Sequence, residues 1–135
     1  MTTYAEVPAA IVQRVRAACA HLPEAYEEQA FTGVRWRIRG STLAHVVSVV
    51  TAGGDVVKLT FHSVGEERDA LLAVGDPFAP GWGPGLMAVV LREEGTDWEE
   101  VRELVTESYR LLAPKKLIAL LTQPGGPPPS GCAAR

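Results

Sequence analysis

Two segments of the chain place apolar residues at the three- and four-residue spacing of an amphipathic helix. The first covers residues 8–22, where Pro8 suits the first turn of a helix and Pro23 ends the run. The second follows Gly95, and its apolar face carries Trp98, Val101, Leu104, Val105, Tyr109 and Leu112. We therefore predict a helix near each end of the chain.

Between these helices, apolar and polar residues alternate with the two-residue period of a β-strand. The alternating runs cover residues 26–32, 34–39, 43–51 and 56–62, and glycine-containing turns separate them. The last of these turns, at residues 53–55, is typical of a β-hairpin. These runs predict an antiparallel meander.

The segment after the meander contains one more helix and one more strand. Ser63 and Glu66 have the spacing of a capping box for a helix over residues 64–74. A loop rich in glycine and proline follows at residues 75–85, and residues 86–92 form a near-continuous apolar strand. This part of the chain therefore predicts a helix and a strand joined by a long loop.

A second capping box, Thr96 with Glu99, introduces the last long helix, and Pro114 starts a short one. Beyond that helix the tail QPGGPPPSGCAAR has no apolar periodicity. We therefore assign residues 1–122 to one domain and predict that residues 123–135 form a disordered tail.

The strands follow one another rather than alternating with helices, in the order α-β-β-β(β)-α-β-α. This order predicts an α+β fold, an antiparallel sheet of about five strands with helices mainly on one face. The other face of the sheet is then at least partly open.

Length, cysteine usage and charge narrow the class of protein. A chain of 135 residues can bury a core without a metal or disulfide. Its two cysteines, Cys19 on an apolar helical face and Cys132 in the tail, form no metal-binding motif, which favours a reducing compartment and argues against structural zinc.

Because there is neither a signal-peptide pattern nor an apolar run of about 18 residues, we expect a cytoplasmic location and no membrane partner. The net charge of −3 gives no general attraction to nucleic acid, so any basic surface is local.

Four segments of the sequence carry a family resemblance: AHLPEAYEEQAF, VRWRIRG, VVKLTFHSVGEERDALLA and, most specifically, DWEEVRELVTESYRLLAPKKL. Together they resemble the MmcQ/YjbR-like family over about residues 8–121. The features that match this family are the Leu22-Pro23 pair, Lys58, Trp98 and the Ser108-Tyr109 pair.

The resemblance implies a fold similar to frataxin-like and secretion-chaperone-like α+β domains, together with the DNA-binding role by which the family is described. Many members carry a His-Trp pair in the strand before the last helix, where this chain has Gly85, Leu86 and Met87, so no role of that pair carries over. The acidic iron-binding ridge of frataxin-like proteins is not implied either, because the first helix carries Arg14 and Arg16 and no carboxylate.

Two of the predicted strands place basic and polar residues on one face of the sheet. These residues are Arg35, Arg37, Arg39, Lys58, Thr60 and His62. If the helices cover the apolar side, the arginines, the lysine and the histidine form a basic patch on the open face that suits phosphate or another anion. Alternatively, this is a solvated face whose arginines pair with Glu27, Glu28 or Asp55.

Other candidates have structural interpretations beside the functional ones. Trp82, in the loop of residues 75–85, either covers the edge of the core or contacts a ligand or partner. The three histidines, His21, His45 and His62, belong to no recognised catalytic motif. Acidic residues of the last helix suit a solvated face. We therefore predict no catalytic residue, no cofactor and no metal site.

Three functional hypotheses remain open. The first is a non-enzymatic binding module that takes an anion on the basic open face, or DNA, weakly and without sequence preference. The alternative is a protein-interaction or chaperone-like module, homodimeric or with another partner, that uses Val47, Val49 and Trp82. The third is a small-molecule or anion pocket between the sheet and the loop of residues 75–85.

Overall fold

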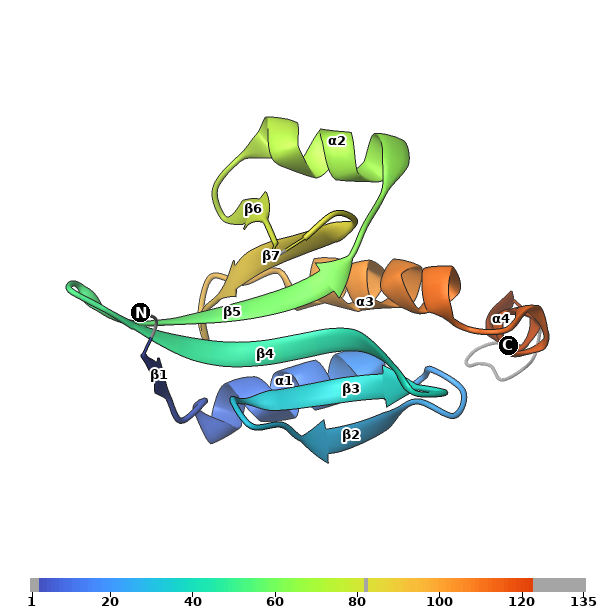
Figure 1. Cartoon of the computed structure of the whole chain (residues 1–135), viewed down its shortest axis with the longest axis horizontal. Helices are drawn as coiled ribbons and strands as arrows, with labels where there is room; N and C mark the ends of the chain where they lie inside the picture. The colour runs from blue at the N-terminus through green and yellow to red at the C-terminus, as the bar shows by residue number, and fades with distance from the viewer. Residues whose placement is uncertain (1–2, 82, 123–135) are drawn as a thin grey trace.

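One antiparallel sheet forms the centre of the molecule in the computed structural model, which describes residues 3–81 and 83–122 (Figure 1). The strands are β1 (Tyr4–Ala5), β2 (Tyr26–Gln29), β3 (Val34–Ile38), β4 (Ser41–Thr51), β5 (Gly54–His62), β6 (Phe78–Pro80) and β7 (Leu86–Leu91). The helices are α1 (Ala9–Cys19), α2 (Gly65–Val74), α3 (Trp98–Leu112) and α4 (Lys115–Thr122). Within the described residues the strand order is β2-β3-β4-β5-β7-β6, and β1 pairs with β4.

The helices α1 and α3 lie behind the sheet in Figure 1 and pack against each other across one of its faces. Helix α2 lies at one edge, beside β6. Alternate residues of β3 and β5 are buried toward α1 and α3, namely Val34, Trp36, Ile38, Val57, Leu59 and Phe61. The predicted α+β fold, with helices mainly on one face of an antiparallel sheet, is therefore confirmed.

The number of strands was predicted too low, because the described part of the chain forms a seven-stranded sheet. Strand β1 precedes the first helix, and β6 lies inside the predicted loop of residues 75–85. Strands of two and three residues are too short to show a two-residue period in the sequence. These two strands form because they pair with β4 and β7. Trp82 and the tail of residues 123–135 lie outside the described residues, and so do the predictions made for them.

The predicted capping box at the start of α2, Ser63 with Glu66, is wrong. The helix begins at Gly65, and Val64 occupies the N-cap position without a side-chain cap. Ser63 is buried instead, and its hydroxyl donates to the Glu67 carboxylate at 3.4 Å. The serine therefore links the end of β5 to α2, a use of the side chain that spacing alone does not reveal.

The predicted capping box at the start of α3, Thr96 with Glu99, is also wrong. Asp97 is the N-cap residue, and its carboxylate accepts from the N–H groups of Glu99 at 3.1 Å and Glu100 at 3.2 Å. The Thr96 hydroxyl accepts from the Arg92 N–H at 2.7 Å in the preceding turn. A carboxylate at a helix N-terminus also interacts favourably with the helix dipole, which favours Asp97 as the cap.

A buried hydroxyl on α3 joins this helix to the sheet where two strands separate. The ladder of β4 and β5 reaches Ala44 and Phe61, and Leu43 and His62 come next. There the Ser108 hydroxyl donates to the Leu43 carbonyl at 2.6 Å and accepts from the His62 N–H at 3.0 Å. One side chain therefore satisfies a backbone group on each strand beyond the end of their ladder.

The next residue, Tyr109, ties α3 to the segment that follows α1. Its ring is fully buried, and its hydroxyl donates to the Pro23 carbonyl at 2.8 Å. Leu22 is buried beside it in the core. The Ser108-Tyr109 and Leu22-Pro23 pairs, which carried the family resemblance, therefore both serve the packing of α3.

The Ser108 bridge predicts a specific loss of stability. Ser108→Ala leaves a carbonyl and an N–H without their partner between helix and sheet, and each such group costs about 1–3 kcal/mol. We expect the free energy of unfolding, measured by urea denaturation, to fall by about 2–6 kcal/mol. Tyr109→Phe is the matched control, because it removes one hydrogen bond of the same helix and should cost about 1 kcal/mol. Equal losses in the two variants would contradict the bridge.

Candidate ligand site on the open sheet face

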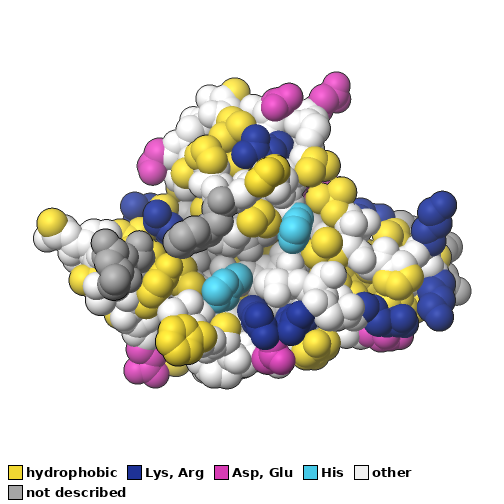
Figure 2. All heavy atoms as spheres, in the orientation of Figure 1, with side chains coloured by type: hydrophobic (Ala, Val, Ile, Leu, Met, Phe, Trp, Pro, Cys, Tyr) yellow, Lys and Arg dark blue, Asp and Glu magenta, His cyan; other side chains and the backbone are white. Residues whose placement is uncertain are grey.

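The sheet face opposite α1 and α3 carries a row of polar side chains. Arg35 on β3 pairs with His45 on β4, and His45 pairs with Thr60 on β5, so three neighbouring strands contribute one residue each. Figure 2 shows this face, with two histidines and several basic side chains around its hollowed centre. Arg35 therefore lies on the open face, as the alternation of β3 predicted.

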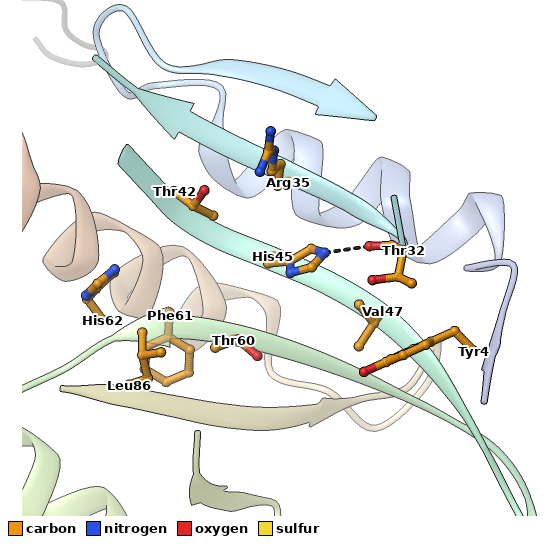
Figure 3. A pocket seen from close by; sticks show the side chains of 10 residues that line it. All are labelled: Tyr4, Thr32, Arg35, Thr42, His45, Val47, Thr60, Phe61, His62 and Leu86. Carbon is orange, nitrogen blue, oxygen red and sulfur yellow. Dashed lines mark hydrogen bonds between the residues drawn. The ribbon is translucent and has the colours of Figure 1, made fainter. Parts of the chain in front are cut away.

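Two adjoining hollows mark this face, and Figure 3 shows the first. The first has a volume of about 420 Å³ and is lined by Tyr4, Thr32, Arg35, Thr42, His45, Val47, Thr60, Phe61, His62 and Leu86. The second, of about 350 Å³, is lined by Tyr4, Val47, Val49, Lys58, Thr60, Pro80, Gly81 and Ala88. Three lining residues are common to both, so the hollows form one concave surface along the sheet.

A single carboxylate, that of Glu28 on β2, holds both arginines of this face. Arg35 donates Nε to Glu28 Oε1 at 2.6 Å and contacts the same oxygen through Nη2. Arg37 Nη1 lies 3.3 Å from that oxygen, and Arg37 Nη2 donates to the Gly40 carbonyl. The hydrogen bond from Arg35, and after it that from Arg37, hold the pKa of Glu28 below its usual range. Two guanidinium groups therefore share one negative charge.

Arg39 does not join this group, contrary to the prediction. Strand β3 ends at Ile38, and Arg39 follows in a turn with a left-handed backbone, at a φ of 50°. Because the alternation of the strand ends there, the Arg39 side chain donates elsewhere, from Nε to Glu24 at 2.9 Å. It also interacts electrostatically with Tyr109 of the helix layer. The predicted patch of three arginines is thereby reduced to two.

Lys58 forms no ion pair within the described residues. It is exposed on β5, opposite Val47, and lines the second hollow. Of the other carboxylates predicted as partners of the arginines, Glu27 binds Arg16 of α1 at 2.7 Å, and Asp55 forms no ion pair in the described part of the chain. The solvated-face interpretation is therefore right about Glu28, but it does not account for Lys58.

His45 is held in one orientation by the turn between β2 and β3. Its Nε2 lies 2.6 Å from the Thr32 carbonyl oxygen, as the dashed line in Figure 3 marks. A carbonyl oxygen only accepts, so Nε2 donates, and in the neutral ring Nδ1 is left as an acceptor. The site therefore contains an imidazole with a defined acceptor on the side away from Thr32.

The turn that holds His45 requires glycine at position 33. Gly33 has a φ of 76°, and a Cβ at this position would lie 1.9 Å from the Val46 carbonyl oxygen. The preceding residues of the turn differ in their surroundings, since Thr32 lines the first hollow whereas the Phe31 side chain is fully exposed. The close approach of Gly33 to β4 therefore sets the place of the Thr32 carbonyl beside His45.

Sequence reasoning missed Tyr4 and the place of His45 in the site. The place of His45 follows from the turn between β4 and β5, which lies at residues 52–53 rather than at the predicted 53–55 and pairs His45 with Thr60. Tyr4 offered no signal, because its strand has two residues and depends on pairing with β4. His62 lines the first hollow, on the face that its alternation predicted.

His21 and Cys19 lie at the C-terminal end of α1, outside both hollows. The Thr106 hydroxyl donates to the Arg102 carbonyl at 2.6 Å, so His21 Nε2, at 2.8 Å from that hydroxyl, is the donor of the pair. Burial, and after it the charge of Arg102, lower the pKa of His21 to about 4. Burial likewise raises the pKa of the Cys19 thiol to about 12. Both groups are therefore uncharged at neutral pH and serve packing.

Residues 3–81 and 83–122 contain neither a candidate metal site nor a candidate membrane span. No group of three or more histidine, cysteine or acidic side chains in these ranges could hold a metal ion. The acidic residues of α3, which were predicted to form a solvated face, are exposed; they are Glu99, Glu100, Glu103 and Glu107. No helix of the described chain is long and apolar enough to cross a membrane.

The environment of His21 predicts a pH-dependent stability. In the unfolded chain the imidazole takes up a proton near pH 6.5, whereas in the folded chain it does so only near pH 4. Between these values the unfolded state binds more protons, so the free energy of unfolding should decline as the pH falls from 6.5 to 4. His21→Gln should flatten this window in urea denaturation, with a measurement above neutral pH as the reference. An unchanged slope in the variant would assign the decline to other groups.

A solved structure shares this fold. The crystal structure of the Deinococcus radiodurans protein DR2400, which carries a DUF419 domain, is similar with a TM-score of 0.53 at 20% identity, over 75% of this chain and 77% of that chain. At this identity the likeness concerns the fold alone. Among curated proteins, none matches this chain.

The family model described as YjbR matches residues 20–111, more than half of the chain and most of the sheet. The chain therefore belongs to the YjbR family.

Proposed function

We propose that this chain is a non-enzymatic binding module that takes a small anionic ligand on its open sheet face. The observation that carries the proposal is the pair of adjoining hollows, lined by Arg35 in one and Lys58 in the other. Their volumes of about 420 and 350 Å³ suit a small molecule, because such sites usually measure about 300–1,000 Å³. The mixed lining, with Val47 and Tyr4 beside polar groups, also has the usual character of a small-molecule site.

The charge balance of the face favours an anion. The basic residues Arg35, Arg37 and Lys58 stand against one carboxylate, that of Glu28. An anion bound beside Arg35 or Lys58 would neutralise the excess positive charge. Because Glu28 already holds Arg35 through two nitrogens, it competes with such a ligand and lowers the affinity of the site.

The hydrogen bonds of the histidines support binding rather than catalysis. His45 donates Nε2 to a backbone carbonyl, that of Thr32, and not to an acidic or nucleophilic side chain. The described contact between a histidine and a hydroxyl joins His21 to Thr106, away from the hollows. A general base paired with a nucleophile is the arrangement that nucleophilic catalysis needs, and neither contact supplies it.

A nucleic-acid backbone is another source of the same anionic chemistry. Phosphate contacts from Arg35 and Lys58 would give weak, salt-dependent binding without sequence preference. Two observations favour a small ligand over a duplex. The basic groups line hollows rather than a raised surface, and Arg39, which would extend the patch, is bound to Glu24.

A protein contact is the second candidate, and Phe31 is the observation that favours it. This side chain is fully exposed at the tip of the turn between β2 and β3. Val47 and Val49, which were predicted as partner contacts, line the hollows and are half-buried. If the protein self-associates, Phe31→Ser should shift its sedimentation toward the monomer, whereas a monomeric parent protein would count against a homodimer.

The competition between Glu28 and a ligand provides the test of the anion proposal. Binding of inorganic phosphate is measured by isothermal titration calorimetry at low salt. Glu28→Gln frees Arg35 and should raise the affinity about two- to fivefold, the range of an exposed ion pair. Lys58→Gln should lower it by a similar factor. Glu24→Gln is the matched control, because it frees Arg39 outside the hollows and should leave the affinity unchanged.

Two results decide between the alternatives. No gain with Glu28→Gln together with no loss with Lys58→Gln would overturn the proposal. A labelled DNA duplex, followed by fluorescence anisotropy, tests the nucleic-acid source. Duplex binding that falls steeply with salt and disappears in Arg37→Glu would favour nucleic acid over a small ligand.

A further inference from the structure

Resting on the proposed function, we infer that the ligand is a small aromatic acid that carries a hydroxyl or N–H donor between its ring and its acid group. The first hollow offers three chemistries, which Figure 3 shows. Tyr4 and Val47 form an apolar end, His45 and Thr60 form a hydrogen-bonding middle, and Arg35 lies beside His45 on β3. A ligand that matches these chemistries has a ring, a donor and an acid.

The middle of the hollow requires a donor from the ligand. His45 donates Nε2 to the Thr32 carbonyl, so its Nδ1 in the neutral ring can only accept. Thr60 lies directly opposite His45 in the register of β4 and β5, and its hydroxyl can donate or accept. A ligand hydroxyl can therefore donate to His45 and accept from Thr60. A carboxylate has no proton to offer Nδ1, so the donor must be a separate group of the ligand.

The apolar end suits an aromatic ring. Tyr4 reaches over β4 from β1, and its ring lines both hollows (Figure 3). Val47 lies beside it on β4 and also lines both hollows. A flat ring placed against Tyr4 would gain a ring–ring contact in addition to the burial of apolar area, and neither gain is open to an inorganic anion.

The β3 side of the hollow, where Arg35 lies, suits a carboxylate. Arg35 directs Nε and Nη2 at one oxygen of Glu28, and its side chain keeps 34% of its surface exposed. A guanidinium group has five N–H donors, so donors remain that can pair with a ligand carboxylate in the planar geometry typical of arginine. The acid of the ligand and Glu28 would then share Arg35.

Three acids that differ by one group test this inference on the full chain. Phenyllactate has the ring, the hydroxyl and the carboxylate, whereas phenylpropionate lacks the hydroxyl and lactate lacks the ring. By isothermal titration calorimetry, phenyllactate should bind roughly fivefold more tightly than phenylpropionate, the effect of one hydrogen bond. It should bind roughly tenfold or more tightly than lactate, because the ring is buried.

Two variants assign these preferences to their residues. His45→Leu should abolish the preference for phenyllactate over phenylpropionate, and Tyr4→Leu should abolish the preference over lactate. Glu24→Gln is the control and should leave both ratios unchanged. Each readout is a ratio of two ligands on one protein, so a partial loss of folded protein does not alter it. Tyr4 lies on the short outer strand β1, so its substitution spares the core if His45→Leu fails to fold.

The outcomes separate the ligand class from the proposed function. Equal affinities for phenyllactate and phenylpropionate in the unsubstituted protein would overturn the inference, as would unchanged ratios in both variants. If phosphate binding responds to Glu28→Gln but none of the three acids binds, anion binding stands and the ligand class is wrong. If neither phosphate nor any of the acids binds, both proposals are wrong.

Discussion

The hydroxyl of Ser108 joins helix and sheet at the place where β4 and β5 separate, and the geometry of the open face depends on it. It donates to the Leu43 carbonyl and accepts from the His62 N–H, so one side chain of α3 fixes the ends of two strands. The backbone of His62 is thereby held toward the helices while its side chain lines the first hollow. The helix layer thus shapes the hollow although none of its lining residues among those described belongs to a helix.

The charge on the open face is arranged by the pairing of β2 with β3. Glu28 lies opposite Arg35 in the register and also reaches Arg37, so one carboxylate limits the repulsion between two cations on the same face. Lys58 has no such partner among the described residues and faces the other hollow. An anion on this face would therefore contact one cation that is already paired, Arg35, and one that has no ion pair among the described residues, Lys58. If the face binds an anion as proposed, the charge alone gives moderate affinity, and the groups between the charges decide which ligand is preferred.

The features that could be predicted from the sequence are those in which periodicity and burial agree. Trp36 alternates with basic residues and is buried, so the two faces of β3 follow from the pattern. Arg39 continues the pattern in the sequence, but its backbone has already left the strand. Glu28 was one of three predicted carboxylate partners, and choosing it requires the register of β2 on β3. Tyr4 and the cap of α3 depend on contacts between distant or competing groups, and a local pattern does not contain that information.

Tyr4 belongs to a strand that is held to the sheet by two register pairs, Tyr4 with Val49 and Ala5 with Ser48, and by the Val50 N–H that donates to the Thr3 carbonyl at 2.9 Å. So short an outer strand detaches at a lower free energy than the central strands, through local opening rather than global unfolding. When β1 is detached, Tyr4 no longer lines the hollow. The apparent affinity of a ligand that contacts Tyr4 is therefore reduced in proportion to the fraction of molecules in which β1 is paired. Amide hydrogen exchange at Val50 would consequently slow when the hollow is filled, which makes the start of the chain a natural reporter of occupancy.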